Sequence, residues 1–85
     1  MLLRITTSIP NTSSHSLLSA LNQQDVVLCS GDGVYAMEAI QAAHPELTVY
    51  AFMPDCAARG LNVTPTITSD TLSQLQQQHQ QWITI

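Results

Sequence analysis

Basic residues are almost absent from this sequence. There is no lysine, and the basic side chains are those of Arg4 and Arg59. Charged residues make up 9% of the chain, and the formal net charge is −4. This argues against direct binding of nucleic acid, which uses Lys and Arg to replace the counterions of the phosphates. It argues equally against docking on an anionic membrane.

Long apolar runs are absent too. No run approaches the roughly 20 residues of a membrane-spanning helix. A signal peptide has a basic segment followed by an apolar one. Residues 1–4 (MLLR) do not begin such a pattern. We therefore expect a cytoplasmic protein. The two cysteines, Cys29 and Cys56, form no CxxC pair, and in a reducing compartment we expect thiols rather than a disulfide.

Patterns that bind metals or phosphates are also missing. The histidines show no HxxxH or HxH spacing, so no metal site is expected. These residues are His15, His44 and His79. Gly31-Asp32-Gly33 is not a phosphate loop, because position 36 is alanine and no Lys-Ser/Thr pair follows. A flavodoxin-like module that binds a nucleotide or small anion at its strand ends stays an alternative, but the scarcity of cations counts against it. No cofactor is expected.

Hydrophobic residues, in contrast, make up 45% of the 85 residues. We expect one domain, residues 1–85. A chain this short buries only about 60–65% of the surface that it exposes when unfolded. Few charged residues are available to cover the surface of this chain. We therefore expect a partner to cover part of that surface, because the cores of protein interfaces are poor in charge.

The apolar pattern alternates between strands and helices. Strands are expected at 2–6, 25–29, 47–53, 63–68 and 82–85. Helices are expected at 15–23, 34–43, 54–60 and 69–80, with a turn cluster at 10–14. Ser69 or Asp70 is expected to cap the last of these helices. Pro65 places the fourth strand near a sheet edge. The order predicts an α/β fold of three layers, α/β/α, with a mostly parallel sheet of about five strands.

In such a sheet, ligands and partners meet the carboxyl ends of the strands. Segments 7–11, 30–35 and 54–60 are expected to gather there. The glycines of the Gly31–Gly33 turn permit a sharp change from strand to helix, and Asp32 is expected to cap that helix. The functional interpretation is that Asp32 and Tyr35 face a partner at this edge.

Two segments resemble a known family. Residues 25–36 (DVVLCSGDGVYA) look like the second strand and the "DGVYA" turn of the DsrH/TusB family. Residues 49–61 (VYAFMPDCAARGL) resemble its third strand and "D-x-x-A-R-G" segment. The resemblance runs through almost the whole chain, including the Trp near its end, and it implies the DsrEFH-like fold.

The resemblance implies a role in passing persulfide sulfur between proteins. Family members are the small subunits of hetero-oligomers with two sisters, TusC- and TusD-like or DsrF- and DsrE-like. The TusBCD branch leads to 2-thiolation of the wobble uridine of tRNA, and the DsrEFH branch to sulfur oxidation. The main sulfur-accepting cysteine lies on the TusD/DsrE sister. DsrH proteins of sulfur oxidisers carry a cysteine in the first helix, where this chain has His15-Ser16-Leu17-Leu18. This favours the TusB-like branch and a structural, interaction role.

The residues expected at the rim of the relay site come from the two motifs. They are Asp32, Gly33, Tyr35, Asp55, Arg59 and Gly60. Cys56 leaves an alternative open, a direct sulfurtransferase, because a helix N-terminus and Arg59 lower the pKa of a nearby thiol. The competing interpretation makes Cys56 a small apolar residue, and Cys29 is expected in the core. The sequence leaves open whether the isolated chain is a monomer or a homodimer.

Overall fold

The computed structural model of this chain describes residues 1–9 and 12–85. Its strands form one parallel, five-stranded sheet in the order β4-β3-β2-β1-β5. They are β1 (Leu2–Ile5), β2 (Val26–Cys29), β3 (Thr48–Phe52), β4 (Thr66–Ile67) and β5 (Trp82–Thr84). The helices are α1 (Thr12–Ser19), the 3₁₀ helix η1 (Gly31–Ala36), α2 (Met37–Ala43), α3 (Met53–Ala58) and α4 (Ser69–Gln78). The expected α/β class is confirmed.

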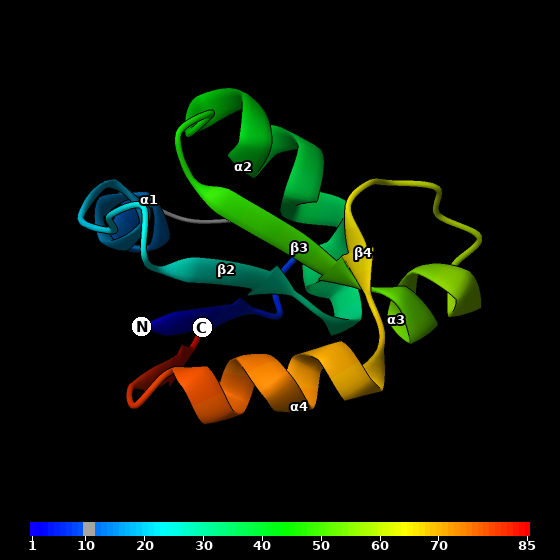
Figure 1. Cartoon of the computed structure of the whole chain (residues 1–85). Helices are drawn as coiled ribbons and strands as arrows, with labels where there is room; N and C mark the ends of the chain where they lie inside the picture. The colour runs from blue at the N-terminus through cyan, green and yellow to red at the C-terminus, as the bar shows by residue number, and fades with distance from the viewer. Residues whose placement is uncertain (10–11) are drawn as a thin grey trace.

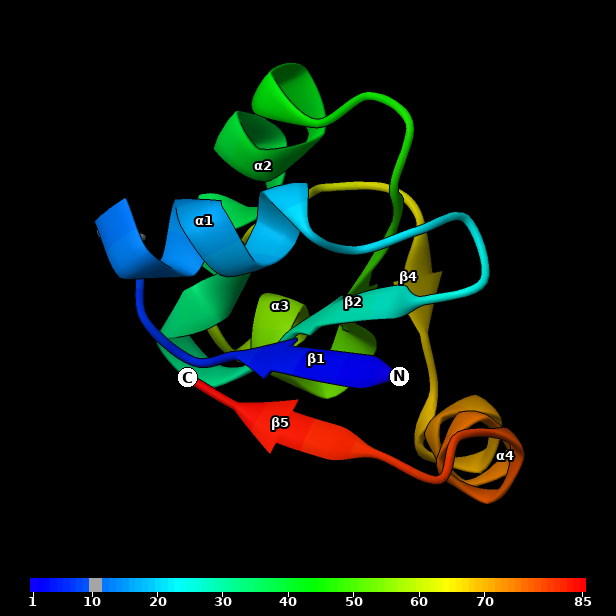
Figure 2. The same cartoon turned by 90° about the vertical axis from the view of Figure 1, so that its left-hand side faces the viewer.

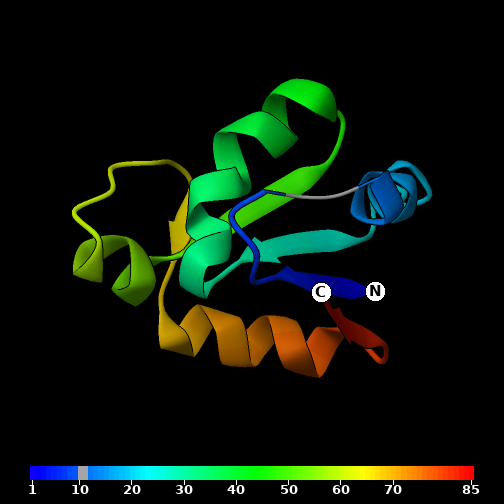
Figure 3. The same cartoon turned by 180° about the vertical axis from the view of Figure 1, so that it is seen from behind.

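The strand order places the helices on the two faces of the sheet. From β1 to β4 the chain moves one strand at a time in the same direction, and right-handed crossovers keep the connecting helices on one face. The connection from β4 to β5 runs back across the sheet, so α4 lies on the opposite face. Figures 1 and 3, which view the molecule from opposite sides, both show α2 and α4 on opposite sides of the strands.

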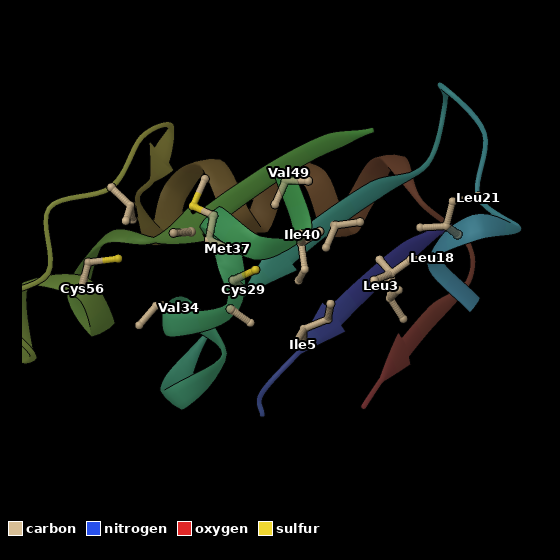
Figure 4. Packing of buried hydrophobic residues seen from close by; sticks show 14 residues of the cluster. Leu3, Ile5, Leu18, Leu21, Cys29, Val34, Met37, Ile40, Val49 and Cys56 are labelled. Atoms are coloured by element: carbon tan, nitrogen blue, oxygen red, sulfur yellow. The ribbon is translucent and has the colours of Figure 1, made fainter. Parts of the chain in front are cut away.

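The larger part of the core lies between the sheet and helices α1 to α3. Figure 4 shows this cluster running from Leu21 and Leu18 at one end to Cys56 at the other. Alternate strand residues, such as Leu3 and Ile5, point into it because successive side chains of a strand face opposite sides. The smaller part packs under α4 and consists of Leu2, Val26, Leu28, Ile67 and Leu72.

The ends of several elements differ from the sequence-based expectation. The first helix begins at Thr12 rather than at residue 15, while Pro10 and Asn11 of the expected turn cluster lie outside the described residues. The fourth strand, expected at 63–68, covers only Thr66–Ile67. Pro65 directly precedes it and has no amide hydrogen to donate to a neighbouring strand. The strand does lie at a sheet edge, as expected.

Two expected helix caps are wrong. The last helix is capped by Thr68, whose Oγ1 accepts a hydrogen bond from the amide of Thr71, and not by Ser69 or Asp70. Asp32 makes no capping bond, since the residue before η1 is Ser30. Among the helices of residues 1–9 and 12–85, none combines the length and the apolar character needed to cross a membrane.

Candidate functional site

The carboxyl edge of the sheet brings two of the predicted segments together. Strands β2 and β3 are neighbours in register, with Cys29 opposite Ala51. The segments that follow them, η1 and α3, therefore leave the sheet side by side and pack against each other. They carry the predicted residues Asp32, Asp55 and Arg59.

Hydrogen bonds of side-chain and backbone groups join three residues into what we call the carboxyl-edge cluster (Asp32, Asp55 and Arg59). The Gly31 amide donates to Oδ2 of Asp55 at 2.7 Å. Arg59 donates through Nη2 and Nε to Oδ1 of Asp32, at 3.1 and 3.4 Å. Its Nη1 donates to the backbone oxygen of Asp55 at 3.1 Å. The cluster thus ties η1 to α3 by both backbone and side-chain groups.

The ion pair of Arg59 with Asp32 fixes the geometry of the cluster more than it stabilises the fold. Asp32 is 69% exposed and Arg59 is 26% exposed. An ion pair this open to solvent contributes about 0–1 kcal/mol. The bond from Gly31 to Asp55 is better shielded, since it is partly buried. Asp32, expected to cap a helix, instead pairs with Arg59 across the gap between η1 and α3.

Both predicted rim glycines have a structural reason. A Cβ atom at Gly33 would lie 1.9 Å from the carbonyl oxygen of Ile5, so η1 can approach β1 only without a side chain there. Gly60 has a φ of +61° and ends α3. Its amide bonds to Ala57, and the next amide, that of Leu61, bonds back to Cys56, as in a Schellman motif.

Exposed apolar side chains also lie on the two segments that carry the cluster. Tyr35, on η1, is 50% exposed, and Met53, at the start of α3, is 46% exposed. The sequence pointed to Tyr35 but not to Met53. The signal for Met53 was its position directly after a buried strand, where a long apolar side chain no longer has a sheet to pack on. The two residues make this edge more apolar than its charges suggest.

Both cysteine side chains are buried, Cys56 included. Cys56 is 3% exposed and belongs to the main core cluster. Burial, and then the nearby charge of Asp55, raise the pKa of its thiol. Arg59 lowers this pKa, as expected, but burial and Asp55 outweigh it, so the pKa of the thiol is raised overall. Cys29 is fully buried, and burial raises its pKa to about 12. Both cysteines are free thiols.

The histidines lie apart from this edge. The rings of His15 and His44 stack with centroids 5.9 Å apart, which the sequence spacing did not reveal. Within residues 1–9 and 12–85, no group of three or more His, Cys, Asp or Glu side chains is arranged to hold a metal ion.

A polar hollow lies at the opposite, amino edge of the sheet. Its volume is about 690 Å³, and it is lined by Met1, Gln24, Asp25 and residues 78–81. Oδ1 of Asp25 accepts a hydrogen bond from the terminal ammonium at 2.8 Å. This bond, helped by the Asn22 amide, lowers the pKa of the Asp25 carboxyl. None of the predicted rim residues lines this hollow.

A family model described as "DsrH like protein" matches residues 7–81, which is most of the 85-residue chain. The matched range contains η1, α3 and all residues of the carboxyl-edge cluster. No curated protein matches the sequence.

Proposed function

Since this chain belongs to the DsrH-like family of sulfur-relay subunits, we propose that it serves its relay as an interaction subunit and carries no sulfur itself. The thiols are the observation that carries this proposal. A persulfide forms when a thiolate attacks a sulfur atom of a donor, so the accepting thiol must ionise and be reachable. Cys29 and Cys56 are both buried, and both have raised pKa values.

The partners in this proposal are TusC- and TusD-like sister subunits. The sulfur-carrying cysteine then lies on the TusD-like sister. The carboxyl edge of this chain supports such a contact, because Tyr35 and Met53 offer exposed apolar area on η1 and α3, and hydrogen bonds of the cluster hold these two segments together. A surface that is already ordered loses little conformational entropy when it binds.

Within the family, we place the chain on the branch that leads to 2-thiolation of the wobble uridine of tRNA. The support is the first helix, where residues 15–18 (HSLL) contain no cysteine. A subunit for sulfur oxidation that used its own thiol would need one there. The scarcity of basic side chains supports a role at a distance from the RNA, with the nucleic acid bound by another protein.

Co-expression with the TusC- and TusD-like proteins of the same genome tests the proposal. We expect the three chains to purify as one stoichiometric complex. Replacing the exposed pair (Tyr35→Ser with Met53→Ser) should weaken the complex at least about tenfold, because exposed aromatic side chains dominate interface energies. The control is Gln23→Ser, an exposed polar residue between α1 and β2. A wild-type chain that stays alone in the presence of both sisters would refute the proposal.

A further inference from the structure

One helical segment at the carboxyl edge exposes a stripe of side chains. The 3₁₀ helix η1 passes directly into α2, so residues 31–43 form one continuous helical run. Its buried side, with Val34 and Met37, belongs to the main core cluster. Side chains three residues apart lie on the same side of a helix. We give the name η1 stripe to three exposed residues with this spacing, Asp32, Tyr35 and Glu38.

The η1 stripe places an aromatic ring between two carboxylates. Tyr35 is half exposed. Arg59 already pairs with Asp32, on one side of the ring. Glu38, on the other side, forms no ion pair within residues 1–9 and 12–85. A Lys or Arg side chain can lie on an aromatic ring and pair with a carboxylate at the same time. The stripe therefore has the chemistry to receive such a cation beside Glu38.

The basic side chains of the chain are engaged elsewhere. The chain contains no lysine, and its net charge is −4. Arg59 is held by Asp32 and by the backbone oxygen of Asp55. Arg4 donates to Ser30 and lines a small hollow beside α4. Figure 2, which looks along α4, shows the strands between that helix and α2, so Arg4 lies on the far side of the sheet from the stripe.

A second copy in a symmetric pair does not supply the cation either. A two-fold contact through the η1 stripe would bring the stripe against itself, so that carboxylates would face carboxylates. Like charges brought together in this way cost free energy. The cation must then come from a different protein. Such a partner would also cover the apolar area of Tyr35 and of Met53, on the adjoining α3, which a small free cation would leave exposed.

We propose that the η1 stripe receives a Lys or Arg side chain of a sister subunit, which lies on the ring of Tyr35 and pairs with the carboxylate of Glu38. The inference rests on the proposed function, because it takes the sister subunits as the partners. It adds the chemistry of the contact, an acidic surface on this chain and a basic one on the sister.

The first arm of the test reverses the charge of Glu38 in the complex reconstituted with the TusC- and TusD-like sisters. Glu38→Lys should weaken the complex at least about tenfold at roughly 0.15 M salt, because the new cation repels that of the sister. At roughly 1 M salt, where charges are screened beyond about 3 Å, most of this difference should disappear. The matched control is Glu46→Lys, the same change at an exposed residue beyond the other end of α2. It should change the affinity by less than about threefold, since screening at roughly 0.15 M salt acts over about 8 Å.

The outcomes of this arm separate the inference from the proposed function. If the wild-type complex forms and Glu38→Lys binds as tightly as Glu46→Lys, the inference is overturned and the interaction role stands. If the wild-type chain does not join its sisters, both are overturned.

The second arm identifies the cation. The photocrosslinking residue p-benzoylphenylalanine replaces Tyr35 in the reconstituted complex, and mass spectrometry locates the crosslinked segment. We expect a segment of a sister that contains Lys or Arg. Changing that residue to Glu should restore the affinity lost in Glu38→Lys to within about threefold of wild type, because the charges of the pair are then exchanged. A crosslink to a copy of this chain, a segment without Lys or Arg, no crosslink, or no recovery would overturn the proposal.

Discussion

Replacing Gly33 with alanine is expected to prevent the chain from folding. The new Cβ atom would lie 1.9 Å from the carbonyl oxygen of Ile5 and 2.6 Å from its carbon. Both are backbone atoms of β1, which is hydrogen-bonded between β2 and β5 and cannot move aside without breaking the sheet. A clash of this kind belongs with the rare substitutions that cost more than about 4–5 kcal/mol. That cost approaches the whole stability of a small domain, about 5–15 kcal/mol.

The matched control for this prediction is Gly60→Ala. A Cβ atom at Gly60 meets no other atom within 4 Å, and the residue has a φ of +61°. The substitution should therefore cost only the strain of a left-handed conformation, about 1–2 kcal/mol. Circular dichroism and thermal melting distinguish the two variants. A Gly33→Ala protein that melts within a few degrees of Gly60→Ala would show that η1 does not approach β1 as described.

Removal of the Asp55 carboxylate should loosen the carboxyl edge. In the wild-type chain the Gly31 amide donates to Oδ2 of Asp55 at 2.7 Å, and this bond is partly buried. Asp55→Ala removes the acceptor and leaves the amide unsatisfied. An unsatisfied group of this kind costs about 1–3 kcal/mol. For a chain of this size, the melting temperature should fall by roughly 5–15 °C. Hydrogen exchange at the Gly31 amide should become faster than in the wild-type chain, because this amide has lost its acceptor.

Asp32→Ala serves as the control, since Asp32 is the other carboxylate bound to Arg59. It is 69% exposed, so its loss should cost at most about 1 kcal/mol and leave the Gly31 amide protected. If the two variants lose the same stability, then the ion pair with Arg59, rather than the bond to Gly31, holds η1 to α3.

Much of the fold was predictable from local patterns. The continuous apolar run Val26–Cys29 forms β2, which is buried on both faces between β1 and β3. His44-Pro45 ends α2 at Ala43, because the residue before proline avoids the helical region. The lengths of irregular elements were harder to predict. The 3₁₀ helix η1 depends on the contact of Gly33 with Ile5, which is distant in the sequence.

The candidate site was predictable only in outline. Parallel order alone indicated that Asp32 and Asp55 would meet at one edge. For Cys56 the sequence left two interpretations open, a reactive thiol and a small apolar residue, because a helix of six residues gives no periodicity from which to tell its buried side. Arg4 illustrates the same limit: its place in a strand was expected, but its hydrogen bond to Ser30 depends on how β1 and β2 pair.

The central claim is that this chain belongs to a sulfur relay without carrying sulfur. The most direct measurement loads the reconstituted complex of this chain and its TusC- and TusD-like sisters with a low-molecular-weight persulfide. Intact mass spectrometry then reads each subunit separately. We expect one added sulfur atom on the TusD-like sister and none on this chain, whose thiols are buried. An added sulfur on this chain that disappears with Cys56→Ser, but not with Cys29→Ser, would contradict the account.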